Sequence, residues 1–107
     1  MNFKACVYGL KELEELEAKG FPSQSAAAAF AAKEAFGKAL GIGIKGFSLF
    51  EVEILHQANG SPYLYLSGNA KKLAAQSGLN FSVSISHSKG LAAAVVIGYS
   101  ETVSNGG

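Results

Sequence analysis

Residues 30–46 place one carboxylate and several amines beside a glycine-rich loop. This segment reads Phe-Ala-Ala-Lys-Glu-Ala-Phe-Gly-Lys-Ala-Leu-Gly-Ile-Gly-Ile-Lys-Gly. On a helix, Glu34 and Lys38 are four residues apart, so both side chains emerge on one face, and Lys45 follows in the loop. A carboxylate suits a metal ion and lysines suit a phosphate, which predicts metal-assisted phosphate chemistry. The simpler interpretation is an exposed ion pair contributing about 0.2–0.5 kcal/mol.

The glycines that follow allow two interpretations. Gly41, Gly43 and Gly46 formally match the glycine pattern of dinucleotide-binding folds, but that pattern must follow a strand and open a helix. Here it follows an expected helix and opens an expected strand, so we reject a dinucleotide site. The loop is either a helix cap with a flexible turn, or a phosphate-binding loop that uses the amides of Gly41 and Gly43 together with Lys45.

A second candidate group lies in the segment Ser-Ile-Ser-His-Ser-Lys-Gly. Ser86 and His87 stand at the end of an expected strand, where backbone and side-chain donors could gather around an anion. The alternative is a structural or solvated histidine. His56, close to the Asn-Gly turn, is interpreted as a surface residue, and the single cysteine, Cys6, as a structural thiol.

Composition limits the class of protein. The 107 residues are 49% hydrophobic and 16% charged, and the nine lysines and eight glutamates leave a formal charge of +1 without any Arg or Asp. This near-neutral balance predicts no basic surface for nucleic acid. The sequence has no apolar run long enough for a membrane span, and we do not expect its first residues to act as a secretory leader. One cysteine cannot form an intrachain disulfide, so we expect a cytoplasmic protein.

The patterning predicts an α+β fold in one domain over residues 1–107, with residues 100–107 as a mobile tail. A largely antiparallel sheet of about four strands should pack against two or three helices. Leucines at helical spacing predict a helix from Leu10 that ends at Gly20, with its acidic face solvated. A second helix should begin at Ser23 or Ser25, either of which can act as its cap, and run to Leu40, and a third should span 69–77. The expected strands span 50–55, 62–67, 81–86 and 91–99, with turns at 59–60 and 87–90.

Several motifs occur in one order along the chain: Phe30-Ala-Ala-Lys-Glu-Ala, Lys38-Ala-Leu-Gly, Glu51-Val-Glu-Ile, Asn59-Gly-Ser-Pro-Tyr-Leu, Leu66-Ser-Gly-Asn-Ala and Val83-Ser-Ile-Ser-His. Together they resemble holo-acyl-carrier-protein synthase, the small class of 4′-phosphopantetheinyl transferases, from about Tyr8 to Tyr99. The Lys-Glu-Ala-x-x-Lys core with Ser-Ile-Ser-His at the right distance carries most of this resemblance.

The resemblance implies transfer of the phosphopantetheine arm of coenzyme A to a serine of an acyl carrier protein in fatty acid biosynthesis, with Mg²⁺ on the pyrophosphate. It implies that Glu34 is a catalytic residue and the metal ligand. It also implies that Lys38 is a catalytic lysine that contacts phosphate and relays a proton, and that Ser86 and His87 contact the phosphates of coenzyme A. Gly41, Gly43 and Lys45 would lie close to the nucleotide. The expected assembly is a homo-oligomer, a trimer by resemblance, with the active site between subunits.

The chain also departs from the family pattern. The family normally begins with a Gly-x-Asp-Ile strand, whose Asp is a second metal ligand, and a basic helix that docks the carrier protein. Ala29 stands where an arginine is common. We therefore expect a chain that begins after both elements, with an open sheet edge that favours self-association. Two functions stay open. One is an enzyme whose missing ligand comes from a neighbouring chain or is dispensable. The other is a non-catalytic chain, either a truncated remnant or a module that binds coenzyme A or a partner, in which Mg²⁺ binds weakly or not at all.

Overall fold

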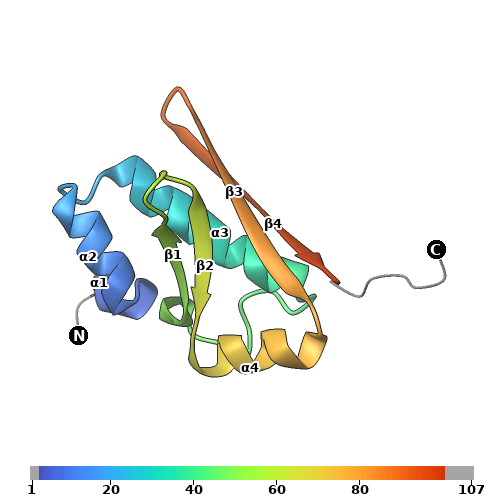
Figure 1. The fold of residues 1–107 in the computed structure, drawn as a ribbon. Helices are drawn as coiled ribbons and strands as arrows, with labels where there is room; N and C mark the ends of the chain where they lie inside the picture. The colour runs from blue at the N-terminus through green and yellow to red at the C-terminus, as the bar shows by residue number, and fades with distance from the viewer. Residues whose placement is uncertain (1–2, 101–107) are drawn as a thin grey trace.

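The computed structural model describes residues 3–100, which form a set of helices followed by two β-hairpins with a helix between them (Figure 1). The elements in chain order are α1 (Phe3–Val7), α2 (Leu10–Ala18), α3 (Ser23–Ala39), the 3₁₀ turn η1 (Leu49–Glu51), β1 (Val52–His56), β2 (Pro62–Leu66), α4 (Gly68–Ser77), β3 (Asn80–Ser88) and β4 (Leu91–Tyr99). This confirms the expected α+β class. The five-residue α1 was not predicted.

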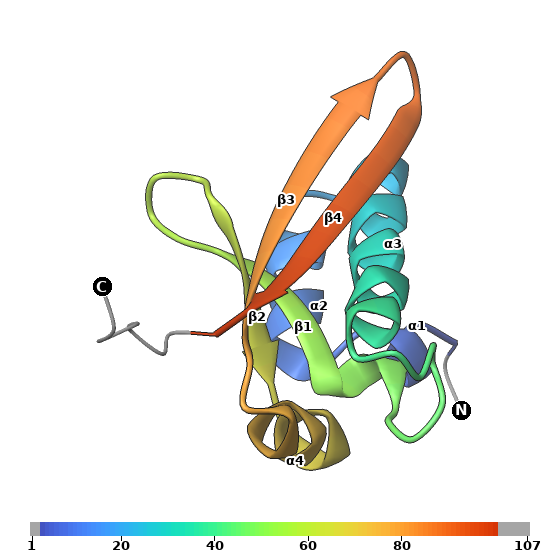
Figure 2. The ribbon, with the colours of Figure 1, turned by 90° about the vertical axis from the view of Figure 1, so that its right-hand side faces the viewer.

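Helix α3 is the long central element, and one of its sides is made largely of alanine. Ala26, Ala28, Ala29 and Ala32 are buried on it. Figure 2 shows α3 beside the β3–β4 hairpin, with which it makes its most extensive contacts. Its C-terminus is set by Gly41, whose φ of +82° is the left-handed conformation that glycine adopts without steric cost. The predicted end of this helix is confirmed.

The four strands form two separate two-stranded antiparallel sheets, β1 with β2 and β3 with β4. In the second hairpin, Ser88 pairs with Leu91 across the tight turn at Lys89 and Gly90, both of which have positive φ. The alternating residues Phe81, Val83 and Ile85 pack against the core, as the period of a strand requires. Strand β3 runs two residues further than predicted, so His87 belongs to the strand and not to the turn.

The core is centred on Phe36 of α3, which is fully buried. Its ring meets the edges of Phe47 and Phe81 with centroids 5.5 and 5.0 Å apart. Such edge-to-face pairs add to the free energy gained by burial. They connect α3 to the segment before β1 and to β3, which fixes the distance between the helix and both hairpins.

The expectation that the acidic face of α2 is solvated was wrong in part, and a glutamate of β1 is buried as well. Glu12 on α2 and Glu53 on β1 are buried, with 1% and 6% of their surface exposed. The acidic face of α2 is therefore not wholly solvated, and β1 is covered on both faces. The reason is that each carboxylate has partners in the interior: Glu53 accepts the backbone N–H of Glu12 at 2.9 Å, and Glu12 pairs with Lys33 at 2.7 Å.

Three further expectations concern boundaries. Helix α3 begins at Ser23 after Pro22, and no side chain caps it, so neither Ser23 nor Ser25 has the predicted capping role. The hairpin at Asn59-Gly60 is confirmed, with Gly60 at φ +90°. Residues 101–107 of the expected tail lie outside the described residues. Across residues 3–100, no helix has both the length and the apolar character that a membrane crossing requires.

Candidate active site

Helix α3 presents Glu34 and Lys38 on its outer side. Both side chains are exposed, whereas Lys33, Phe36 and Gly37 on the opposite side of the helix are buried. Within the described part of the chain no hydrogen bond or ion pair joins Glu34 to Lys38. The interpretation of these two residues as an exposed ion pair is therefore wrong. The carboxylate and the ammonium instead face solvent one turn apart. This arrangement leaves both available to a ligand.

The glycine loop closes the C-terminus of α3. The amide of Gly41 donates to the Lys38 carbonyl at 2.9 Å, and the amides of Ile42 and Gly43 donate to the Gly37 carbonyl at 3.1 and 3.0 Å. The helix-cap interpretation is therefore confirmed. Binding of a ligand by Gly41 and Gly43 stays a prediction, but their amides are already engaged. The exposed side chain of Lys45 is therefore the group of this loop that is best placed to bind an anion.

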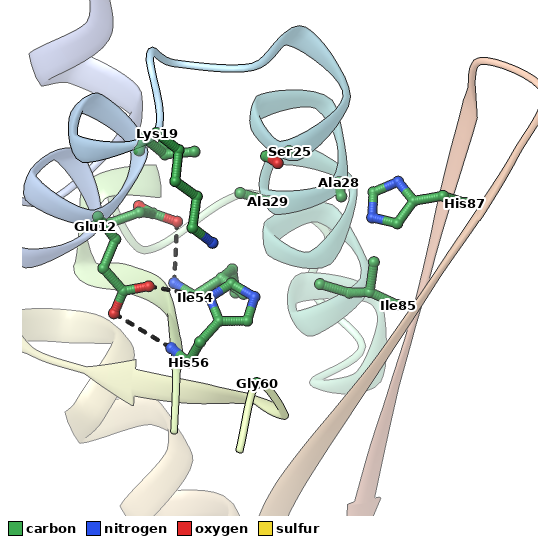
Figure 3. A pocket seen from close by; sticks show the side chains of 12 residues that line it. Glu12, Lys19, Ser25, Ala28, Ala29, Ile54, His56, Gly60, Ile85 and His87 are labelled. Atoms are coloured by element: carbon green, nitrogen blue, oxygen red, sulfur yellow. Dashed lines mark hydrogen bonds and ion pairs between the residues drawn. The ribbon is translucent and has the colours of Figure 1, made fainter. Parts of the chain in front are cut away.

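Ser86 and His87 lie on opposite faces of β3, because successive side chains of a strand alternate. His87 shares its face with Ile85 and lines a pocket of about 250 Å³ between β3, α2, the first half of α3 and the end of β1 (Figure 3). Ser86 is exposed on the other face. A small ligand inside the pocket can therefore meet the side chain of His87 but not that of Ser86.

The pocket has polar groups that the sequence did not single out. Lys19 and His56 line it together with His87, and Figure 3 shows these three side chains among those that line the pocket. His56 pairs through Nδ1 with Glu15 Oε1 at 3.0 Å. His56 is exposed, as expected of a surface residue, and it also lines this cavity. No pattern in the sequence indicates this, since α2 and the end of β1 meet only in the folded chain.

Small residues give the pocket its depth. Ala28 and Ala29 form part of its wall, and both are buried. A longer side chain at Ala29 would enter the same space. The result is a cavity of mixed character, lined by apolar side chains, by three nitrogen-bearing side chains and by the carboxylates of Glu12 and Glu15, so an anionic group would meet His87 and Lys19 on the side away from these carboxylates.

Glu34, Lys38 and Lys45 do not line this pocket. A single chain therefore presents two separate candidate surfaces: the outer side of α3 with its loop, and the pocket that contains His87. Among residues 3–100 no three potential metal-binding side chains come together. The donors present fit Mg²⁺ held by the Glu34 carboxylate and completed by ligand oxygens and water, which is a common mode for this ion, and not a cage made of protein groups.

Comparison with known proteins places this geometry in a family. Residues 6–96 match the model of the 4′-phosphopantetheinyl transferase superfamily. The chain belongs to this superfamily. The holo-[acyl-carrier-protein] synthase of Fusobacterium nucleatum is 39% identical over 98 residues, which cover 90% of this chain and 80% of that protein.

Solved structures of the family agree with the fold. The holo-[acyl-carrier-protein] synthase of Neisseria meningitidis matches with a TM-score of 0.83 and 33% identity over 91% of this chain and 79% of that one. The Helicobacter pylori enzyme in complex with coenzyme A matches with a TM-score of 0.76 and 33% identity, over 91% and 81% of the two chains. The matched region of the family model includes both candidate surfaces.

Proposed function

We propose that this protein transfers the 4′-phosphopantetheine arm of coenzyme A to a serine of an acyl carrier protein. The observation that carries the proposal is the family match over residues 6–96, which contains the helix of Glu34 and Lys38 and the strand of His87. In this reaction the serine oxygen bonds to the phosphorus that carries pantetheine, and the bond from that phosphorus to the bridging oxygen breaks. Adenosine 3′,5′-bisphosphate leaves with the electron pair, and the hydroxyl proton is released.

The outer side of α3 supplies the groups that such a transfer needs. Phosphoryl transfer depends on positioning and on neutralising negative charge. Lys38 and Lys45 can bind phosphate oxygens, and Glu34 can hold Mg²⁺. A bound Mg²⁺ would neutralise charge on the pyrophosphate. His87 is assigned to the phosphates of coenzyme A, with Lys19 and His56 beside it in the same pocket.

The proposal includes self-association, with the site shared between chains. Glu34 and His87 serve different surfaces of one chain, so a ligand could bridge them by lying between two copies. The outward face of β4 is apolar and exposed, with Leu91 at 75% and Val95 and Ile97 at 56% each. Patches of this kind commonly mark interfaces. We propose a homo-oligomer, a trimer by resemblance, and a cytoplasmic location in keeping with the single cysteine.

Association is tested by light scattering and by mixing inactive variants. Ile97→Lys should shift the protein to monomer, because a charge on an apolar contact surface must be desolvated. If the site is shared, mixing Glu34→Gln with His87→Ala should restore part of the activity, since some sites then combine two intact halves. A wild-type protein that is monomeric at micromolar concentration, or a mixture no more active than its components, contradicts the shared site.

The activity itself is tested with coenzyme A, Mg²⁺ and an apo carrier protein, by following the mass increase on the carrier serine. Glu34→Gln should lower the rate about 100-fold or more and weaken the dependence on Mg²⁺. Glu14→Gln, an exposed glutamate on α2, is the matched control and should behave as wild type. Coenzyme A binding by calorimetry without any transfer would favour the alternative of a binding module, which the family comparisons do not favour.

A further inference from the structure

Lys33, the residue before Glu34, has no solvent exposure. A lysine in this situation is unusual, because a buried ammonium loses its hydration. The proposed reaction does not use Lys33, since its side chain points into the molecule while Glu34 points out. Its contacts therefore require a separate account.

The Lys33 ammonium has three donors and three acceptors around it. It contacts Glu12 Oε1 at 2.7 Å, the Leu49 carbonyl at 3.2 Å and the Val52 carbonyl. These acceptors belong to α2, η1 and β1, so one side chain of α3 is bonded to three other elements. Because an ammonium has three N–H groups, Lys33 has no donor left for a phosphate.

Glu12 completes the same network. Its Oε1 also accepts the Gly9 amide at 3.2 Å, and its Oε2 accepts the Ile54 amide at 3.0 Å. Strand β1 has β2 on one side only, and its other edge is bonded to side chains of α2 and α3 instead of a strand; Figure 3 shows the bonds from α2 to β1 as dashed lines. No buried side-chain nitrogen or oxygen among the described residues is left without a partner.

Stability alone does not explain this network. Burial raises the pKa of Glu12 and lowers the pKa of Lys33, so desolvation opposes both charges. Buried ion pairs can often be replaced by uncharged groups at little or no cost in stability. Phe36 already anchors α3 by packing, and what the pair adds is direction: the alanine side of the helix has little relief to set its rotation, whereas an ammonium with three fixed acceptors does set it.

We propose that Lys33 is a positioning residue, which fixes the rotation of α3 against the edge of β1 so that Glu34 and Lys38 face the substrate side at the correct angle. Successive helix residues differ by about 100°, so holding Lys33 inward holds Glu34 outward. This inference rests on the proposed function for its consequence on catalysis. A misplacement of about 1 Å can cost about 100-fold in rate.

The test uses the double variant Lys33→Met with Glu12→Gln. The carbonyl of the introduced glutamine can keep the bond to the Ile54 amide, and its NH₂ can donate to a carbonyl that Lys33 leaves, while the Gly9 amide loses its acceptor. The introduced methionine fills the volume of the lysine stem. The single variant Lys33→Met leaves Glu12 charged and buried, and serves for comparison. Leu64→Ala, on β2, is the control because it loosens the core; Leu64 pairs with Ile54 across the sheet, but its side chain takes no part in the hydrogen bonds of Lys33 and Glu12.

Two measurements decide the proposal. In the folded double variant, backbone amide NMR shifts of residues 33–38 should move, while those of α4 stay unchanged. Transfer assays should show kcat lower by about 10- to 100-fold and the Mg²⁺ concentration for half-maximal rate raised, with KM for the carrier protein unchanged. Leu64→Ala should lower the melting temperature without these changes.

Unmoved amide shifts in the double variant overturn the proposal, whether or not the protein is active. Moved shifts with unchanged kcat and Mg²⁺ dependence also overturn it, since the orientation would then have no catalytic consequence. If wild-type protein transfers nothing and binds no coenzyme A, the proposed function fails, and the amide shifts still decide whether Lys33 sets the orientation of α3.

Discussion

Glu12→Gln is the substitution for which the structure gives the clearest expected magnitude. Glutamine keeps the volume of the side chain and an acceptor for the Ile54 amide, but it removes the charge 2.7 Å from the Lys33 ammonium. Both side chains are almost fully buried, with 0% and 1% exposure. Removing one partner of such a pair costs about 3–5 kcal/mol because the other charge stays buried. Small domains have a total stability of about 5–15 kcal/mol.

The effect should depend on pH through Lys33. Burial lowers its folded-state pKa below the usual value, and loss of the Glu12 charge lowers this pKa further. The stability that a depressed lysine contributes is present above the unfolded pKa of about 10.4 and is lost as pH falls through the folded pKa. Glu12→Gln should therefore be less stable at pH 7 than at pH 9.5, by a larger margin than wild type.

Denaturant unfolding followed by far-ultraviolet circular dichroism suits this protein, which has no tryptophan. Glu14→Gln should stay within about 0.5 kcal/mol of wild type because it is on the surface. The double variant with Lys33→Met should lose the pH dependence. A Glu12→Gln protein within about 0.5 kcal/mol of wild type at pH 7, with the same pH dependence, would refute the description of the pair.

Two more substitutions test the packing around α3. In Gly37→Ala the new methyl group would overlap the Gly43 carbonyl oxygen, so we expect a loss of about 1–3 kcal/mol; an unchanged melting temperature would contradict the close approach of the loop. Tyr8→Phe removes the bond to the Ala26 carbonyl at 2.9 Å and should cost about 0.5–1.5 kcal/mol at pH 7. Burial, and then the Glu12 charge, raise the pKa of Tyr8 above 10.0. Wild type should therefore lose stability as pH rises past that value, whereas Tyr8→Phe lacks this contribution, and pH-dependent melting curves that are parallel for the two proteins would contradict it.

The elements that could be predicted from sequence are those set by local chemistry. Gly41 and Gly78 end α3 and α4 with positive φ, as expected for glycine at these positions. The exposed face of Glu34 and Lys38 follows from the helical period alone. The opposite facing of Ser86 and His87 also follows from the period of a strand, although both were expected to contact one ligand.

What could not be predicted depends on contacts distant in sequence. Glu12 lies among charged residues, and a local pattern assigns such residues to solvent. Its partner is 21 positions away on another helix, and its second contact, the Ile54 amide, is 42 positions away. The pocket was missed for the same reason, because Lys19, His56 and His87 come from three different parts of the chain.

The two lysines on either side of Glu34 show how the fold divides its charges between structure and chemistry. Lys33 has each of its three donors bonded inside the protein, so it cannot bind a phosphate without breaking the contacts that hold α3. Lys38, which lies about one turn after Glu34 on the same helix, is exposed. In the described part of the chain no protein acceptor bonds to it. The family motif contains both lysines, and the helical period already turns Lys33 away from the face of Glu34 and Lys38. Burial decides between them: a substitution at Lys38 should weaken binding of coenzyme A while the fold stays intact, whereas one at Lys33 should first change where Glu34 and Lys38 point.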